Sequence, residues 1–249
     1  MSINLVILAA GKGTRMKSDS AKVLHKVAGA PLLIHAMKAG TSLEPQNIVI
    51  VAGHGADAVS AAALAYDESA QIVLQTEQKG TGHAVLCTKD ALQGATGDLL
   101  VLYGDTPFIS PETLDTIRSA RARFDVVVLG FEAADPARYG RLVMDGNTLE
   151  RIVEFKDASD EERNINFCNS GVILCSTEHM FELLALVTND NAGEEYYLTD
   201  IIGLARAAGL SATAVACAEA ETMGVNSRAD LAAAEAAFQA RARADAREA

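Results

Sequence analysis

The segment INLVILAAGKGTRM, residues 3–16, determines the fold of the chain. Residues 3–10 form an almost entirely apolar run, and a basic loop with two glycines follows directly. A strand that is apolar on both faces is typical of a parallel sheet covered by helices on both sides. Ligands of such sheets bind beyond the carboxyl ends of the strands. The segment therefore predicts the first strand of an α/β sheet, followed by a ligand-binding loop.

The rest of the first half repeats this pattern. Further apolar runs lie at 47–52, 71–74, 98–103 and 125–131. Helical patterns separate the runs at 31–39, 56–65, 82–91 and 111–122. Repeated strand–helix units imply right-handed crossover connections. We therefore predict an α/β fold with a doubly wound, mostly parallel, Rossmann-like sheet.

The pattern changes after the fifth run. Short strand patterns at 141–144 and 148–155 flank Asp145-Gly146, a pair that is favoured in hairpin turns. This arrangement predicts an inserted antiparallel β lobe. Residues 169–174 and 212–217 then return to the buried-strand pattern.

The alanine-rich tail, residues 229–249, predicts one long C-terminal helix. Leu231 and Phe238 are seven residues apart and share one face of that helix. Beyond Phe238 the tail has almost no apolar side chain to bury, so we expect a linker or a frayed end.

The charge balance restricts the partners of the protein. The 249 residues include 21 Lys and Arg against 33 Asp and Glu, a net charge of −12, and no Trp. Such a chain repels nucleic acid and anionic membranes, so neither is an expected partner. The four cysteines have no C-x-x-C spacing, and the N-terminus lacks the features of a signal peptide or a membrane span. We expect a cytoplasmic protein.

The basic loop is a candidate phosphate site. Gly11 and Gly13 leave room for a phosphate chain, and Lys12, Arg15 and Lys22 add positive charge to an acidic protein. The loop matches neither the Walker pattern nor the dinucleotide fingerprint, which needs a third glycine. The alternative is a tight strand–helix turn with surface cations. The concentration of cations favours phosphate binding.

Asp105 follows the run at 98–103 and therefore lies at the same sheet edge as the basic loop. One carboxylate beside bound phosphates is a natural Mg²⁺ ligand. A turn or helix-capping aspartate is an equally good interpretation of Asp105 alone. Gln75 could read a base edge, whereas His83 is more simply a packed or capping histidine. No Ser–His–Asp or Cys–His arrangement is visible, which favours phosphoryl or nucleotidyl transfer over covalent catalysis.

Together these motifs resemble the sugar-phosphate nucleotidyltransferases, most closely the bacterial N-acetylglucosamine-1-phosphate uridyltransferases. The resemblance extends from Leu5 to about Arg228. It implies that Arg15 and Lys22 are the catalytic cations. It also implies a nucleotide site formed by Leu8, Ala9, Ala10, Gly11, Lys12, Gly13, Lys22, Gln75, Gly80, Thr81, Tyr103 and Gly104.

The same resemblance implies a sugar site and a metal site. The motifs at 139–141, 154–157, 169–171 and 195–200 match the sugar pocket of the family, and the sugar-binding residues are Gly140, Glu154, Asn169, Tyr197 and Thr199. The cofactor is Mg²⁺, with Asp105 and Asn226 as its protein ligands. The chain departs from the family pattern at Ala21, Phe167, Glu194 and Met223.

The bacterial enzymes of this kind continue into a left-handed β-helix of hexapeptide repeats, an acetyltransferase domain that this sequence lacks. The resemblance thus implies a nucleotidyltransferase domain at 1–228 and a linker helix at 229–249. Because the missing half builds the trimer in the family, we expect this chain alone to be monomeric and a full-length parent to be trimeric.

The resulting hypothesis is an enzyme that transfers UMP from UTP to N-acetylglucosamine 1-phosphate and releases pyrophosphate. One alternative is the same chemistry with another sugar or base. A second is a non-catalytic nucleotide-binding sensor. A nicotinamide oxidoreductase is disfavoured by the missing third glycine.

Overall fold

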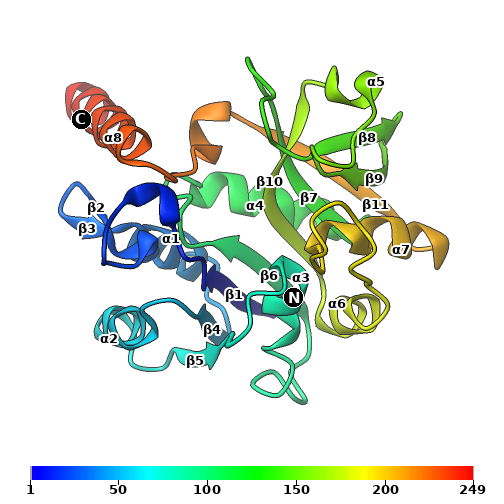
Figure 1. Cartoon of the computed structure of the whole chain (residues 1–249), viewed down its shortest axis with the longest axis horizontal. Helices are drawn as coiled ribbons and strands as arrows, with labels where there is room; N and C mark the ends of the chain where they lie inside the picture. The colour runs from blue at the N-terminus through cyan, green and yellow to red at the C-terminus, as the bar shows by residue number, and fades with distance from the viewer. Residues whose placement is uncertain (1, 249) are drawn as a thin grey trace.

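A nine-stranded sheet runs through the centre of the protein in a computed structural model that describes residues 2–248 (Figure 1). The order along its main path is β11-β7-β10-β6-β1-β4-β5. The strands are β1 (Ile3–Ala9), β4 (Asn47–Ala52), β5 (Gln71–Leu74), β6 (Asp98–Tyr103), β7 (Val126–Glu132), β10 (Phe167–Ser176) and β11 (Ala212–Cys217). All neighbours on this path are parallel except β10, which is antiparallel to both β6 and β7. The predicted doubly wound, mostly parallel sheet is confirmed.

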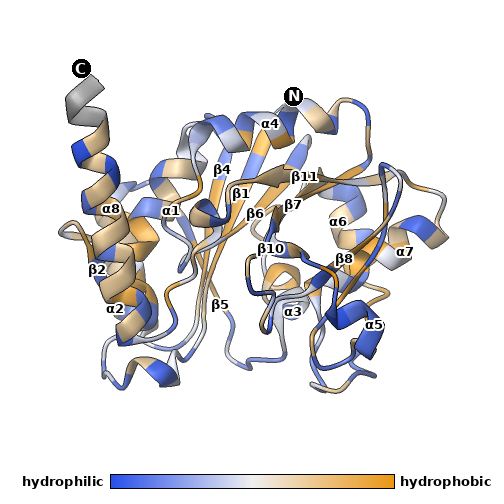
Figure 2. Ribbon diagram, turned by 90° about the horizontal axis from the view of Figure 1, so that it is seen from above, coloured by the Kyte–Doolittle hydropathy of each residue, from blue (hydrophilic) through white to orange (hydrophobic). Residues whose placement is uncertain are grey.

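Helices cover both faces of this sheet. One face carries α1 (Leu32–Thr41), α2 (Ala56–Tyr66) and α4 (Pro111–Arg121), and the other carries α3 (Thr81–Leu86), α6 (Thr177–Leu184) and α7 (Ile201–Ala207). Alternate side chains of β1 enter the two cores: Leu5 and Ile7 on one side, Val6 and Leu8 on the other. Figure 2 shows the apolar strands at the centre between these helices. Burial on both faces explains why the strands appear in the sequence as continuous apolar runs.

The antiparallel lobe predicted after β7 is present. β8 (Arg141–Asp145) and β9 (Thr148–Val153) form a hairpin, and β8 joins the sheet where Arg141 pairs with Cys168 of β10. The short helix α5 (Asp160–Arg163) follows β9 and begins with a capping box. The buried Arg141 guanidinium donates hydrogen bonds to the carbonyls of Ala137 and Arg163, 3.1 and 3.4 Å away, so it ties the lobe together.

The C-terminal helix α8 (Arg228–Glu248) packs against the opposite end of the molecule from the lobe (Figure 1). Leu231 and Phe238 contact a small core around a two-stranded ribbon, which consists of β2 (Lys26–Val27) and β3 (Ala30–Pro31). The helix matches the predicted range except for Ala249, which lies outside the described residues. Its first three turns are thus docked on the α/β domain.

Short 3₁₀ helices complete the chain: η1 (Thr14–Met16), η2 (Lys22–Leu24), η3 (Leu198–Asp200) and η4 (Glu219–Thr222). The helix predicted at 82–91 is shorter than expected and ends at Leu86. There the backbone changes to i→i−3 hydrogen bonds, and the buried Thr88 hydroxyl donates to the Val85 carbonyl at 2.7 Å. None of the helices within residues 2–248 is long and apolar enough to cross a membrane.

Candidate active site

A cavity of about 390 Å³ lies at the carboxyl edge of the sheet. β1 and β6 end side by side there, since Leu8 pairs with Tyr103 and the Gly104 N–H donates to the Leu8 carbonyl at 3.0 Å. The sequence-predicted residues that line it are Leu8, Ala9, Ala10, Gly11, Lys22, Gln75, Gly80, Thr81, Tyr103, Asp105 and Asn226. Val23, Gln78, Ala84 and Glu195 complete the lining. Residues from both ends of the chain thus share one cavity.

The two glycines of the basic loop have different roles. A side chain on Gly11 would meet no atom within 4 Å, so this position leaves open space for a ligand. Gly13 has a φ of +57°, and a Cβ there would lie 2.6 Å from the Cβ of Lys22. Gly13 therefore makes room for Lys22 rather than for a phosphate. Arg15 lies on η1 with an exposed side chain and, like Lys12, is not among the described residues that line the cavity.

Lys22, Asp105 and Asn226 form a contact cluster in the cavity wall. The Lys22 ammonium forms an ion pair with the Asp105 carboxylate and donates a hydrogen bond to Asn226 Oδ1 at 2.9 Å. The Val225 N–H, one residue before Asn226, donates to the Asp105 carbonyl at 2.9 Å. Asn226 was found only through the family resemblance. It precedes α8 and carries no local motif, so only the tertiary fold places it beside Asp105.

The donor set in this cluster fits a magnesium ion. One carboxylate oxygen of Asp105 and the amide oxygen of Asn226 converge on a single cationic atom, the Nζ of Lys22. Within residues 2–248 there is no group of three or more His, Cys, Asp or Glu that could hold a metal. Two protein oxygens completed by phosphate oxygens and water are typical of Mg²⁺ and unlike the all-protein cages of Zn²⁺ or Ca²⁺.

Gln75 lines the cavity, and His83, which is not among its described lining residues, contacts the Gln75 amide. Gln75 is buried, and its Nε2 donates to the Gly80 carbonyl at 3.0 Å and contacts His83 Nδ1 at 3.1 Å. These two contacts engage the amide nitrogen, so Gln75 Oε1 is left to accept a hydrogen bond from a ligand in the cavity. His83 thus orients Gln75, which agrees with its interpretation as a packed histidine.

Thr81 connects the start of α3 to the loop before η3, and thus the residues predicted to bind the nucleotide to those predicted to bind the sugar. Its hydroxyl accepts a hydrogen bond from the Leu198 N–H at 3.0 Å. Tyr196 pairs its N–H with the Lys79 carbonyl and its carbonyl with the Gly82 N–H, both at 2.8 Å. The loop before η3 is therefore joined to the turn that opens α3. Burial raises the pKa of Tyr103, and the negative charges of Glu154 and Asp105 raise it further.

The predicted sugar residues gather beyond Tyr103, around Glu154. Its Oε1 accepts a hydrogen bond from the Thr199 hydroxyl at 3.0 Å. Gly140 lies against both Asn169 and Glu154, since a Cβ on Gly140 would be 3.6 Å from each. Burial raises the pKa of the Glu154 carboxyl, and the charges of Asp200, Asp157 and Glu195 add to the effect. This side of the site is rich in oxygen acceptors and negative potential.

Asn169 is held by an irregularity in β10. The register between β10 and β7 shifts between Asn169 and Ile173. Within the shift, Asn169 Oδ1 accepts a hydrogen bond from the Gly171 N–H at 2.9 Å. Gly171 has a φ of +93°, and a Cβ there would lie 2.6 Å from the Tyr103 ring. The bulge thus makes room for Tyr103, and the Asn169 N–H donates to the Gly140 carbonyl at 2.9 Å. Tyr197 lies in the next loop, where its hydroxyl approaches Gly193.

Comparison with known proteins gives relatives that match nearly the whole chain. The bifunctional protein GlmU of Ruegeria pomeroyi is 65% identical over 245 residues, which are 98% of this chain and 54% of that protein. The chain spans about half the length of the curated relatives it matches.

Solved structures share the fold at low sequence identity. A UDP-glucose pyrophosphorylase complexed with UDP-glucose superposes with a TM-score of 0.76 at 21% identity, covering 97% of this chain and 100% of the other. A nucleoside-diphosphate-sugar pyrophosphorylase from Vibrio cholerae has a TM-score of 0.74 at 15% identity, covering 92% and 99%. The family model of the MobA-like NTP transferase domain matches residues 5–195. That match covers most of the sheet and of the cavity lining, and the chain belongs to the MobA-like NTP transferase domain family.

Proposed function

We propose that the protein transfers UMP from UTP to N-acetylglucosamine 1-phosphate, forming UDP-N-acetylglucosamine and pyrophosphate. The observation that carries the proposal is the convergence of Lys22, Asp105 and Asn226 on one point of a cavity that also contains a base-reading glutamine. A phosphate oxygen of the sugar phosphate attacks the α-phosphorus of UTP. The bond from the α-phosphorus to the bridging oxygen breaks, and pyrophosphate leaves.

The protein contributes position and charge to this step. We assign Lys22, and Arg15 at the loop, to neutralising phosphate charge, the main demand of nucleotidyl transfer. The carboxylate of Asp105 and the amide oxygen of Asn226 would hold Mg²⁺. When bound, the ion would supply positive charge that stabilises the negative charge of the reacting phosphates. Gly11 leaves the backbone beside the cavity open for the close approach of the triphosphate.

Base selection follows from the orientation of Gln75. Its free Oε1 accepts a hydrogen bond from a ring N–H, which uracil presents and cytosine does not. Thymine and guanine also present a ring N–H, so Gln75 alone would accept uracil, thymine or guanine. Gly80 and Tyr103 both line the cavity, and we assign the distinction between pyrimidine and purine to the space beside them. The resemblance to the uridyltransferases makes uracil our choice.

Sugar selection follows from the acceptors around Glu154. A buried carboxylate can accept hydrogen bonds from two sugar hydroxyls, and Asn169 offers an amide donor for an acetamido or hydroxyl oxygen. The acidic side chains near Glu154 repel the phosphate of the sugar and direct it toward Lys22.

The decisive experiment measures pyrophosphate release with and without Mg²⁺. UTP, dTTP, CTP and GTP are each combined with N-acetylglucosamine 1-phosphate and glucose 1-phosphate. We expect Mg²⁺-dependent release to be fastest with UTP and N-acetylglucosamine 1-phosphate. A faster pair of other substrates would identify another sugar-phosphate nucleotidyltransferase. UTP binding without pyrophosphate release under any condition would identify a nucleotide sensor.

Cellular place and assembly complete the proposal. The four cysteines are free, and burial is the main cause that raises the pKa of each thiol, which fits inert thiols in a reducing cytoplasm. We assign 1–228 to catalysis and 229–249 to a linker helix. We further propose a monomer for this chain and a trimer for any longer parent, which size-exclusion chromatography with light scattering will test.

A further inference from the structure

Arg228, the first residue of α8, reaches back to the basic loop. Its Nε donates a hydrogen bond to the Met16 carbonyl at 3.1 Å, and its Nη2 lies 3.5 Å from the Lys17 carbonyl. These carbonyls end the turn that begins at Gly13, where the Met16 N–H donates to the Gly13 carbonyl at 2.9 Å. Lys17 has a left-handed φ of +48°, so its carbonyl points away from the direction of a continuing helix. A guanidinium group matches two such carbonyls with parallel donors.

The turn held by Arg228 also fixes Lys22. Gly13 approaches the stem of Lys22 so closely that it has no space for a Cβ. The ammonium of Lys22 then contacts Asp105 and Asn226. Because the stem of Lys22 packs on the turn, a displaced turn would move the ammonium away from these two oxygens.

The last connection returns from Asn226 to α8. The Asp230 carboxylate accepts hydrogen bonds from the N–H groups of Asn226 and Ser227, at 3.0 and 2.9 Å. The Asp230 N–H donates to the Ser227 hydroxyl at 3.2 Å, which completes a capping box. Arg228, the turn at 13–17, Lys22 and Asn226 therefore form a closed ring of contacts that begins and ends at the start of α8.

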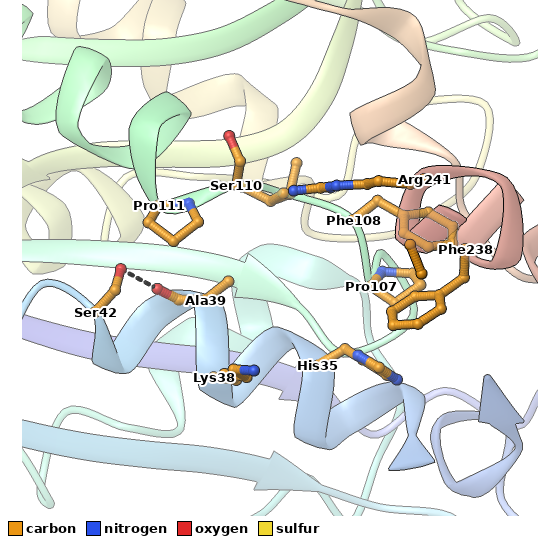
Figure 3. A pocket seen from close by; sticks show the side chains of 12 residues that line it. His35, Lys38, Ala39, Ser42, Pro107, Phe108, Ser110, Pro111, Phe238 and Arg241 are labelled. Carbon is orange, nitrogen blue, oxygen red and sulfur yellow. Dashed lines mark hydrogen bonds between the residues drawn. The ribbon is translucent and has the colours of Figure 1, made fainter. Parts of the chain in front are cut away.

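The body of α8 is anchored independently of Arg228. Glu235 accepts a hydrogen bond from the Ala28 N–H at 2.7 Å, and the ring of Phe238 meets His35 edge-on at a centroid distance of 5.6 Å. Figure 3 shows Phe238 pointing from α8 toward His35 beside Phe108, with Arg241 farther along the helix. Arg228 thus extends from a fixed helix, so its contacts constrain the loop rather than follow it.

We propose that Arg228 is a positioning residue for phosphate binding: it holds the turn at 13–17, and through it Lys22, in the geometry that receives the triphosphate. The inference rests on the proposed function, because it names the triphosphate as the ligand. Arg228 is not among the described residues that line the cavity, so it acts through the loop. Its loss therefore weakens binding of the phosphates and leaves binding of the nucleoside unchanged.

Titration calorimetry of UTP and of uridine separates these effects. We expect Arg228→Ala to bind UTP roughly 10-fold more weakly, as for a lost hydrogen bond from a charged donor, and uridine as the wild type does. Guanidinium ion at millimolar concentration should restore part of the UTP affinity of this variant and have no effect on the wild type. Arg241→Ala, which removes an arginine from the same helix away from the loop, should match the wild type.

Limited trypsin digestion tests the loop without any substrate. Arg15 and Lys17 lie in the turn and Lys12 directly precedes it, so opening of the turn makes the backbone at three trypsin sites easier to cleave. We expect Arg228→Ala to be cut there about threefold faster or more, and Arg241→Ala to be cut at the wild-type rate. This readout holds even if the wild type releases no pyrophosphate from UTP, so failure of the proposed function is distinguishable from failure of the positioning role.

Three outcomes would overturn the inference. They are unchanged UTP binding together with unchanged cleavage in Arg228→Ala, an equal loss of UTP and uridine affinity, or no rescue by guanidinium. If Arg228→Ala does not fold, Arg228→Lys and Arg228→Gln replace it. Lysine keeps the charge and nearly the length of the side chain, and glutamine keeps a planar donor on a shorter one. Neither has the paired donors of a guanidinium group, so Arg228→Lys must also weaken UTP binding more than uridine binding.

Discussion

The two edges of the central sheet each carry a partly buried ion pair, yet we assign a ligand site to only one of them. At the carboxyl edge Lys22 pairs with Asp105, and at the amino edge Arg121 pairs with Asp98 at 3.0 Å. The side chains of the four residues are similarly sheltered, at 15% and 15% exposed in the first pair and 15% and 5% in the second. Neither burial nor charge therefore distinguishes the two ion pairs.

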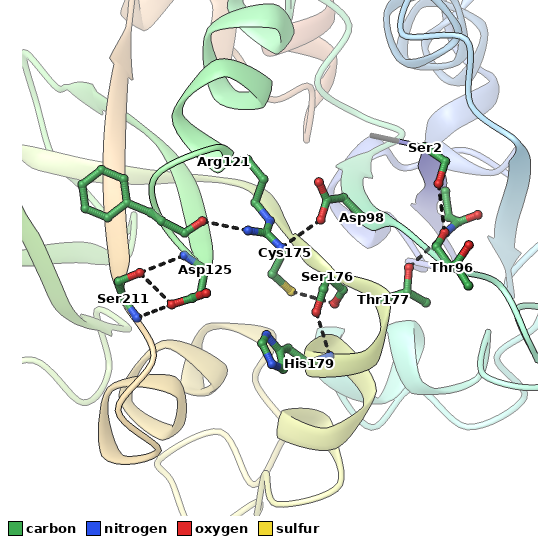
Figure 4. Close-up of polar contacts among 12 residues, drawn as sticks. Ser2, Thr96, Asp98, Arg121, Asp125, Cys175, Ser176, Thr177, His179 and Ser211 are labelled. Atoms are coloured by element: carbon green, nitrogen blue, oxygen red, sulfur yellow. Dashed lines mark hydrogen bonds and ion pairs between the residues drawn. The ribbon is translucent and has the colours of Figure 1, made fainter.

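The difference lies in the neighbours of each pair. At the amino edge Arg121 also donates to the Phe124 carbonyl at 3.0 Å, and nearby Asp125 accepts from Ser211 at 2.7 Å (Figure 4). These contacts join secondary-structure elements to one another. At the carboxyl edge the pair is surrounded by glycines and loop backbone and faces the cavity. The amino-edge pair also lines a cavity, of about 500 Å³, so open space is not the difference between the two pairs. At the carboxyl edge a second side-chain oxygen, that of Asn226, joins the pair, whereas at the amino edge Arg121 is bound to the backbone carbonyl of Phe124.

The largest expected effect is on turnover. Asp105→Ala removes the carboxylate that faces the cavity, and we expect roughly 10²–10³-fold slower pyrophosphate release. The free energy of unfolding should fall by only about 1 kcal/mol or less, because the lysine that remains, Lys22, can turn toward solvent. Asp115→Ala, which breaks a surface ion pair on α4, is the matched control. Wild-type turnover in Asp105→Ala would erase the distinction between the two edges.

The reciprocal change at the amino edge should affect stability instead. Asp98→Ala leaves Arg121 sheltered without its carboxylate, and we expect a loss of about 2–3 kcal/mol in the free energy of unfolding. The KM values for both substrates should stay within about twofold of wild type, because the cavity is at the other edge. Urea denaturation and steady-state kinetics measure the two quantities. A strong rise in either KM value, with no loss of stability, would contradict the structural role that we assign to the Arg121–Asp98 pair.

The junction between the nucleotide and sugar sides can be broken by one methyl group. Gly80 has a φ of +110°, and a Cβ there would lie 2.5 Å from the Tyr196 carbonyl oxygen. Gly80→Ala must push the loop before η3 away from the turn that opens α3, so we expect the KM values for both substrates to rise about tenfold. Gly94→Ala carries backbone strain at φ +77° but meets no atom within 4 Å, so it isolates strain from collision. Equal effects of the two variants would show that the collision does not matter.

The smallest expected effect is a pH dependence of stability at Glu154. Its folded-state pKa is raised, chiefly by burial. A raised pKa means that the native state binds the proton more tightly, so the contribution of Glu154 to stability is present at low pH and is lost as the pH rises through the raised pKa. Glu154→Gln keeps an acceptor for Thr199 and should therefore be more thermally stable than the wild type at pH 8, with a smaller advantage near pH 4. If the stability advantage of Glu154→Gln instead grew toward low pH, the direction that we give for the Glu154 pKa shift would be wrong.

Local sequence patterns predicted some elements closely and others poorly. β4 and β6 have the predicted bounds, because a strand buried on both faces must be apolar at nearly every position. The edge strands β5 and β11 also have the predicted bounds, although they are more exposed. The two-residue strands β2 and β3 were missed, since two residues carry no measurable period. The Ala-rich tail was correctly predicted to be helical, but nothing in its composition indicated that Arg228 reaches the basic loop.

The candidate site shows the same division between local and distant information. Gly11 and Asp105 could be selected because each directly follows a strand, and strand ends meet at one edge. The sequence could not show why residue 13 must be a glycine. A Cβ there would collide with the side chain of Lys22, which lies in the next 3₁₀ helix. Arg15 was grouped with Lys22 by sequence proximity, whereas the structure separates their side chains between surface and cavity.

The sequence by itself thus determined the layered α/β fold, the edge at which a ligand binds and the type of residue available there. Only the tertiary structure decided which charges meet. Lys22 contacts Asp105 from 83 positions away and Asn226 from 204 positions away. The spacing of apolar residues along one strand or helix indicates which of its side chains are buried, and this spacing is a local property of the chain. Contacts between residues so distant in sequence depend on how complete elements pack, and no single segment carries that information.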